Sequence, residues 1–181
     1  ASVQVPCLTL DEVECLGELA LSGAVRPVRG VLPAALAARK AGQIVMISSL
    51  AGKIGSPLRT AYCAAKFGLA GYADALRAEL SQSGVSVHTI YPGSVATGVS
   101  RNALTADGTK RGRSDKAIDE GIPADVAARA MLDGIAAGTR EIIVAEGGEK
   151  AMGELRRTPD ALFDQIAGMV ANGYMDKMEQ N

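Results

Sequence analysis

The sequence lacks several features that identify common protein classes. It has three cysteines in 181 residues, too few and too odd a number for a disulfide framework, and without a C-x-x-C motif it predicts no metal site. Charge of one sign is not in excess either, because 19 Lys and Arg residues oppose 20 Asp and Glu residues. A net charge of −1 excludes a sequence-wide field that would hold nucleic acid or an anionic membrane. We expect a small-molecule partner instead.

Long hydrophobic runs are missing as well. No apolar run approaches the roughly 18 residues that a transmembrane helix requires, and the first residues lack the basic, then apolar layout of a signal peptide. These absences predict a cytoplasmic protein with no membrane attachment. With 48% hydrophobic and 22% charged residues, the composition is that of a globular chain that can bury a core. We expect one domain over residues 1–181.

Strand and helix patterns alternate along the chain. Continuous apolar runs predict buried strands at residues 44–47, 85–91 and 141–145. Helical patterns surround them, at residues 24–40, 59–81 and 123–138. This alternation favours βαβ units with a parallel sheet, hence an α/β fold whose ligands bind beyond the carboxyl ends of the strands.

Two further segments have expected roles. The hydrophobic residues of 98–122 show neither helical nor strand periodicity, and the segment mixes charges of both signs. This pattern predicts a substrate lid at the carboxyl end of a strand, with its charged side chains solvated. In the tail, residues 149–181, apolar side chains recur at helical spacing. We expect this helical tail to cover the core or a partner subunit.

A serine, a tyrosine and a lysine form the candidate site. Tyr62 and Lys66 lie four residues apart on a predicted helix, hence on one face, and Ser49 follows the first predicted strand. An ammonium group nearby stabilises a phenolate, so Tyr62 can give or take a proton, while Ser49 can hydrogen-bond the oxygen being protonated. Alone, such a tyrosine–lysine pair is more often a solvated helix face. Because no side chain can oxidise or reduce carbon, a nicotinamide would have to carry the hydride.

Hydrolysis is the disfavoured alternative chemistry. His88 is the only histidine and falls in the middle of a predicted strand. No G-x-S-x-G elbow surrounds Ser49 or Ser94. A structural role for His88 is therefore favoured.

These residues resemble the short-chain dehydrogenase/reductase family. The segment 43–49 is similar to the strand that ends in the family's catalytic serine, Tyr62 and Lys66 match its Tyr-x-x-x-Lys motif, and 91–97 resembles its Pro-Gly-x-Val-x-Thr segment. The resemblance implies a partial Rossmann-type doubly wound parallel sheet of about three strands. It also implies an oxidoreductase that uses NAD or NADP to transfer hydride between the cofactor and a small carbonyl or alcohol substrate.

The same resemblance implies roles for single residues. Tyr62 would be the general acid/base, Ser49 would orient the substrate carbonyl, and Lys66 would hold the nicotinamide ribose. Tyr62 and Lys66 would thus touch the cofactor, together with four residues after the second predicted strand: Pro92, Gly93, Val95 and Thr97. Val31-Leu32-Pro33 resembles the family's long interface helix, which implies a homo-oligomer, either a dimer or a tetramer.

Two features depart from the family pattern. Ala20 stands where the family has an Asn that orders water in the proton relay, and no G-x-G-x-x-G turn that would cradle a diphosphate occurs. Residue 1 falls just after the family's fourth strand, so we expect the C-terminal portion of a larger domain, without the N-terminal cofactor-binding part. These departures leave a second function open: a catalytically disabled remnant that acts as a structural or assembly partner.

Overall fold

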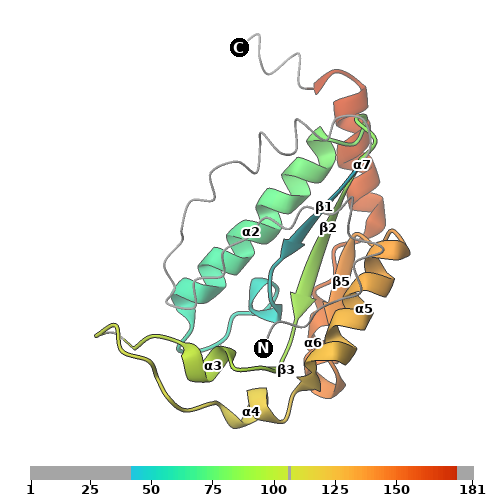
Figure 1. The fold of residues 1–181 in the computed structure, drawn as a ribbon. Helices are drawn as coiled ribbons and strands as arrows, with labels where there is room; N and C mark the ends of the chain where they lie inside the picture. Colours follow the sequence, from blue (N-terminus) through green and yellow to red (C-terminus); the bar gives the residue numbers. More distant parts are fainter. Residues whose placement is uncertain (1–41, 106, 175–181) are drawn as a thin grey trace.

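Three parallel strands form the main sheet in the part of the chain that the structure describes (Figure 1). The structure is a computed structural model that describes residues 42–105 and 107–174. Its sheet contains β1 (Gly42–Ile47), β2 (Val85–Pro92) and β5 (Glu141–Val144), in the order β1-β2-β5. Both neighbouring pairs are parallel. The predicted α/β class with a partial Rossmann-type parallel sheet is confirmed.

Helices cover both faces of this sheet (Figure 1). On one face lies α2 (Thr60–Glu79), with α7 (Asp160–Ala171) packed beside it, and on the other lies α5 (Ala124–Ala136). A shorter helix, α6 (Gly147–Leu155), follows β5. The predicted strands, and the predicted helices on either side of β2, are all present with ends shifted by at most two residues.

Strand β2 is buried on both of its faces. Val85 and Val87 pack in one apolar cluster with Leu76 of α2, whereas Ile90 packs in a second cluster with Ile142 of β5, on the α5 side. Burial on two faces is typical of a strand in the middle of a parallel sheet. This burial fixes the carboxyl end of β2 within the core. It thereby also fixes the position of the segment that follows Pro92.

A polar turn joins α2 to β2. The Ser83 hydroxyl donates to the carbonyl oxygen of Leu80 (2.7 Å) and accepts from the backbone N–H of Val85 (3.3 Å). Gly84 then adopts φ +77°, a left-handed conformation that glycine takes without a steric penalty. This chemistry ends the helix where the sequence predicted and sets the start of β2.

Residues 98–122 contain more structure than the loop that their sequence predicts. Two one-turn helices lie within them, α3 (Val99–Asn102) and α4 (Lys116–Asp119). Helices of four residues are too short to show a helical period. At the two ends of the segment, β3 (Val95–Ala96) and β4 (Ile122–Pro123) pair in parallel and close its base. The lid role of the segment stays a prediction.

Several expectations lie outside the described residues. They are the helix at 24–40, the segment Val31-Leu32-Pro33 and the position of Ala20. Within the described ranges, none of the helices combines the length and the hydropathy needed to span a bilayer.

Replacing Leu76 with Ala is expected to lower the free energy of unfolding by about 3 kcal/mol, because a fully enclosed leucine leaves a cavity. Leu76 is 2% exposed between α2 and the sheet. Leu162→Ala on α7, where the side chain is 45% exposed, is the matched control and should change little. Urea denaturation measures both, and equal losses would contradict a core between α2 and the sheet.

Candidate active site

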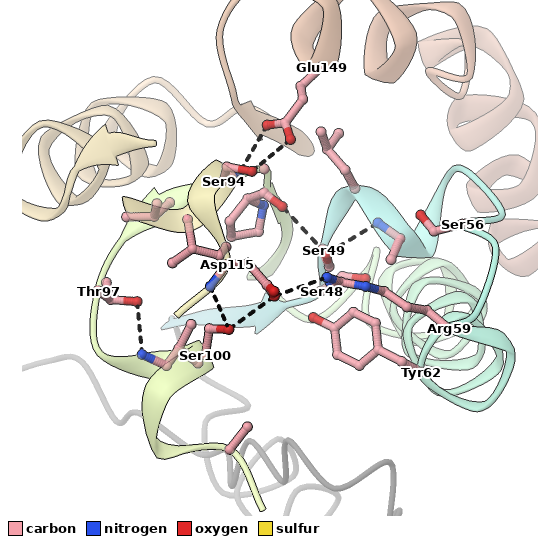
Figure 2. A pocket seen from close by; sticks show the side chains of 18 of the residues that line it. Ser48, Ser49, Ser56, Arg59, Tyr62, Ser94, Thr97, Ser100, Asp115 and Glu149 are labelled. Atoms are coloured by element: carbon pink, nitrogen blue, oxygen red, sulfur yellow. Dashed lines mark hydrogen bonds and ion pairs between the residues drawn. The ribbon is translucent and has the colours of Figure 1, made fainter. Parts of the chain in front are cut away.

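A cavity of about 740 Å³ opens at the carboxyl ends of β1 and β2 (Figure 2). Its walls come from the turn after β1, the start of α2, the segment after β2, residues 98–122 and α6. Six predicted site residues line it: Ser49, Tyr62, Pro92, Gly93, Val95 and Thr97. This is the edge of a parallel sheet at which α/β proteins bind ligands.

Ser49 caps a short turn at the end of β1. It precedes a single turn of 3-10 helix, η2 (Leu50–Gly52), and its Oγ accepts a hydrogen bond from the Ala51 N–H (3.2 Å). The same Oγ lies 3.5 Å from the carbonyl oxygen of Pro92, at the end of the neighbouring strand. The capping bond orients the hydroxyl on the cavity wall, beside the segment that follows β2.

Tyr62 and Lys66 lie close together in the first two turns of α2. The Lys66 Nζ is 5.7 Å from the centroid of the Tyr62 ring. Tyr62 lines the cavity, whereas Lys66 does not: it is 6% exposed, and its Nζ donates to the carbonyl oxygen of Ile47 (3.1 Å). Burial lowers the pKa of Lys66 below that of a free lysine. The ammonium therefore sits behind Tyr62 rather than in the open cavity.

Ser48 and Gly52 hold the start of α2 against the turn after β1. Ser48 is buried, and its hydroxyl donates to the carbonyl oxygen of Lys66 (3.0 Å). A Cβ at Gly52 would lie 2.8 Å from that same carbonyl oxygen, so only glycine fits this approach. Sequence reasoning missed both residues, although they neighbour Ser49.

The segment after β2 forms the opposite wall. Gly93 sits where a side chain would meet Leu50 and Ala145 at 3.2 and 3.0 Å. Thr97 follows β3, and its Oγ1 accepts from the Val99 N–H (3.4 Å). The close packing fixes this backbone along the cavity.

Arg111 and Asp115 of the segment 98–122 form a network at the cavity, which corrects, for these two residues, the expectation that the charges of the segment are solvated. Arg111 donates to both carboxylate oxygens of Asp115 (2.5 and 2.9 Å), and Ser100 donates to one of them (3.0 Å). Arg59, before α2, lies 3.6 Å from the same carboxylate. All four residues line the cavity, and Figure 2 shows Arg59, Ser100 and Asp115 there. Arg111 and Asp115 are four positions apart, but the contacts that tie this pair to Ser100 and Arg59 join residues 11 to 56 positions apart, and no local pattern marks them.

Hydrogen bonding sets the charge state of this network. The bond from Arg111, followed by that from Ser100, holds the pKa of Asp115 well below its usual range. The same hydrogen bond, which Asp115 accepts, raises the pKa of Arg111. Both groups therefore stay charged across the physiological range.

Glu149 of α6 is a further cavity residue that the sequence did not indicate. Its two carboxylate oxygens accept from the backbone N–H and the hydroxyl of Ser94, each at 2.8 Å. It also lines the cavity, above the turn after β2 (Figure 2).

His88 takes no part in the cavity. It is 2% exposed on β2, and its Nδ1 lies 2.8 Å from the carbonyl oxygen of Thr139. It is not among the lining residues, so it does not form a nucleophilic pair with Ser49 there.

Comparison with known proteins identifies the family. The model of the short chain dehydrogenase family matches residues 2–108, more than half of the chain. The chain belongs to the short-chain dehydrogenase/reductase family, whose members are oxidoreductases, so the predicted resemblance is confirmed.

Two relatives illustrate the match. Dehydrogenase/reductase SDR family member 7B of Mus musculus is 33% identical over 155 residues, covering 86% of this chain and 46% of the relative. The Danio rerio protein of the same name is 34% identical over 169 residues, covering 93% and 52%. The chain thus spans about half the length of the curated relatives it matches.

Solved structures share the fold. A short chain dehydrogenase/reductase from Burkholderia phymatum, in complex with NAD, superposes with a TM-score of 0.56 at 21% identity, covering 73% of this chain and 55% of that one. A short-chain dehydrogenase from Sphingobium yanoikuyae, in complex with NADPH, gives 0.51 at 23% identity, covering 81% and 49%. At these identities the likeness establishes the fold alone.

Asp115→Asn is expected to loosen the segment 98–122, because Arg111 loses its charged bidentate partner. The readout is hydrogen exchange of the Gly112 N–H, which donates to the carbonyl oxygen of Arg101 (3.0 Å). Exchange should accelerate in this variant and not in Asp119→Asn, an exposed aspartate of α4.

The lowered pKa of Asp115 fixes the sign of the pH dependence. The network persists when the pH falls to about 4, the ordinary pKa of an aspartate. It is lost only as the pH falls through the lowered value. Loss of Gly112 protection already at that ordinary value would contradict the assignment.

Proposed function

We propose that this chain carries the catalytic part of an NAD(P)-dependent oxidoreductase that interconverts a small carbonyl compound and its alcohol. The observation that carries the proposal is that Ser49 and Tyr62 face one cavity at the carboxyl ends of β1 and β2, with the Lys66 ammonium 5.7 Å from the Tyr62 ring. Membership of an oxidoreductase family supports it.

Tyr62 is the general acid/base of this proposal. In the direction of reduction its hydroxyl donates a proton to the substrate oxygen, and in oxidation its phenolate takes the proton back. The Lys66 cation lies 5.7 Å from the Tyr62 ring, where it attracts the negative charge that develops on the Tyr62 oxygen as the proton leaves, and burial of Lys66 reduces the screening of this attraction by water. The Tyr62 side chain is only half-buried, so its hydroxyl is accessible to a ligand in the cavity.

Ser49 orients the substrate carbonyl. Its Oγ is already held by the Ala51 N–H (3.2 Å), which leaves its proton available to the substrate oxygen. The hydroxyl lies 3.5 Å from the Pro92 carbonyl oxygen, a long contact that a substrate can replace.

The residues of the cavity fit a nicotinamide. A volume of about 740 Å³ falls in the range of roughly 300–1,000 Å³ found for cofactor and small-molecule sites. Pro92, Gly93, Val95 and Thr97 would hold the ring side of the cofactor, along the wall opposite Tyr62. When bound, the nicotinamide supplies or accepts the hydride that no side chain can provide. The relatives solved with NAD and with NADPH support the cofactor class and leave both nucleotides as candidates.

Lys66 has two possible contributions in this site. Its Nζ donates to the Ile47 carbonyl oxygen (3.1 Å), so contact with a cofactor ribose requires that bond to be exchanged for the new one. Its electrostatic effect on Tyr62 needs no such change, and we propose this as its first role.

The decisive test is Tyr62→Phe in the complete natural protein. Removing a general acid/base is expected to lower kcat by about 10² to 10⁴-fold, measured as substrate-dependent NADH or NADPH turnover with a panel of ketones and alcohols. Tyr72→Phe is the matched control, because Tyr72 is an exposed tyrosine of the same helix and should leave kcat unchanged. Full activity in Tyr62→Phe would contradict the assignment. Absence of turnover in the unmodified protein with either nucleotide would favour the structural-partner alternative.

A further inference from the structure

Helix α6 touches both turns that build the cavity. One turn follows β1 and carries Ser49, and the other follows β2 and begins at Pro92. The two turns are joined directly by the long contact between the Ser49 Oγ and the Pro92 carbonyl oxygen (3.5 Å). Helix α6 is bonded to both turns by shorter hydrogen bonds, of 2.8 to 3.0 Å.

The first end of α6 holds the turn after β2. Glu149 accepts from the Ser94 N–H and the Ser94 hydroxyl, each at 2.8 Å. A carboxylate that receives two such bonds is a strong, charge-assisted acceptor. A side chain at Gly93 would collide with this carboxylate, so the turn and the helix are in close contact.

The last turn of α6 packs on Leu50, the residue that follows Ser49. A Cβ at Gly153 would lie 2.8 Å from Leu50 and 3.2 Å from Ile143, so the helix backbone rests directly on the Leu50 side chain. Leu50 also reaches the other turn, since a Cβ at Gly93 would lie 3.2 Å from it. Leu50 is thus enclosed between α6 and both turns.

The second end of α6 is fixed to the turn after β1 by a hydrogen bond from Lys53, whose ammonium also forms a buried ion pair with β5. Lys53, directly after η2, donates to Glu141 (2.9 Å) and to the carbonyl oxygen of Arg156, the C-cap of α6 (3.0 Å). The Lys53 and Glu141 side chains are 4% and 2% exposed. Glu141 also accepts from the Thr158 N–H (2.8 Å) and from the Tyr91 hydroxyl (3.2 Å). Its charge is therefore fully satisfied by neighbours, as a buried charge must be.

We propose that α6 is a clamp that sets the position of the Ser49 turn relative to the Pro92–Ser94 turn, with Glu149 and Lys53 as positioning residues. The value of this clamp for catalysis rests on the proposed function. The clamp itself is a mechanical coupling: contacts at one end of α6 stabilise the turn at the other end. Neither residue donates to or accepts from Ser49 or Tyr62, so their effect is carried by the helix.

The coupling is tested by hydrogen exchange in the complete natural protein. Glu149→Ala is expected to accelerate exchange of the Ser94 N–H roughly tenfold, the factor that one net hydrogen bond corresponds to. The same variant should also accelerate exchange of the Ala51 N–H in the other turn, which donates its hydrogen bond to the Ser49 Oγ. Glu146→Ala is the matched control, because Glu146 is an exposed glutamate that makes no side-chain capping bond at the same end of α6.

The opposite end is tested by Lys53→Met combined with Glu141→Gln, so that no charge is left buried without a partner. This double variant should accelerate exchange of the Ser94 N–H although it changes nothing near Ser94. Should it fail to fold, Gly153→Ala loosens α6 by adding a methyl group against Leu50 and makes the same prediction. Effects that stay confined to the mutated end, at unchanged urea midpoint, would overturn the clamp.

A kinetic arm separates the clamp from the proposed function. In the complete natural protein, Glu149→Ala should lower kcat by about tenfold with little change in the KM of the carbonyl substrate, and Glu149→Gln should restore part of it. Unchanged kcat in a protein that Tyr62→Phe inactivates would overturn the positioning role. Full activity of Tyr62→Phe would instead overturn the proposed function. The hydrogen-exchange measurements would then decide by themselves whether α6 couples the two turns.

Discussion

The site depends on the parallel pairing of β1 with β2. Their register sets Ile47 opposite Ile90, and the Ser48 N–H extends the ladder by one bond to the Ile90 carbonyl oxygen (2.8 Å). Because both strands run in the same direction, their carboxyl ends finish side by side, and the turns that follow share one edge of the sheet. A shift in register by one residue would reverse which side chains face α2 and would move Ser49 away from Pro92.

Helix α2 adds the third component because buried polar contacts fix it to the first turn. The Ser48 hydroxyl holds the Lys66 carbonyl oxygen, and the Lys66 ammonium in turn holds the Ile47 carbonyl oxygen. A buried polar group is costly unless it is paired, so these reciprocal bonds allow one arrangement of helix and strand. Tyr62, one turn before Lys66, is thereby placed at the cavity with its cationic neighbour behind it.

The sequence predicted what is encoded locally. The three strands and α2 follow from apolar runs and helical spacing, and Ser49, Tyr62 and the Pro92–Thr97 segment follow from their places at the ends of those elements. The contacts that complete the cavity join distant positions: Glu149 meets Ser94 across 55 residues and Lys53 meets Glu141 across 88. No periodicity or turn signal marks such pairs, because each partner has an ordinary local sequence.

Polar residues of the segment 98–122 were misinterpreted for the same reason. Arg111 and Asp115 have the spacing of a solvated helical pair, and only the folded structure shows that both are hydrogen-bonded to Ser100 of α3 and face the cavity. Lys66 shows the opposite case. Its spacing from Tyr62 correctly predicted proximity, but the bond that turns its ammonium toward Ile47 depends on where β1 ends, which the helix sequence does not encode.

The most direct measurement of the central claim is a crystal structure of the complete natural protein with a nicotinamide nucleotide and a carbonyl substrate analogue. The account predicts the nicotinamide ring in the cavity, between Tyr62 and the segment from Pro92 to Thr97. It also predicts the analogue's oxygen within hydrogen-bonding distance of both the Tyr62 and the Ser49 hydroxyls. A nucleotide or analogue bound elsewhere, with this cavity containing only solvent, would contradict it.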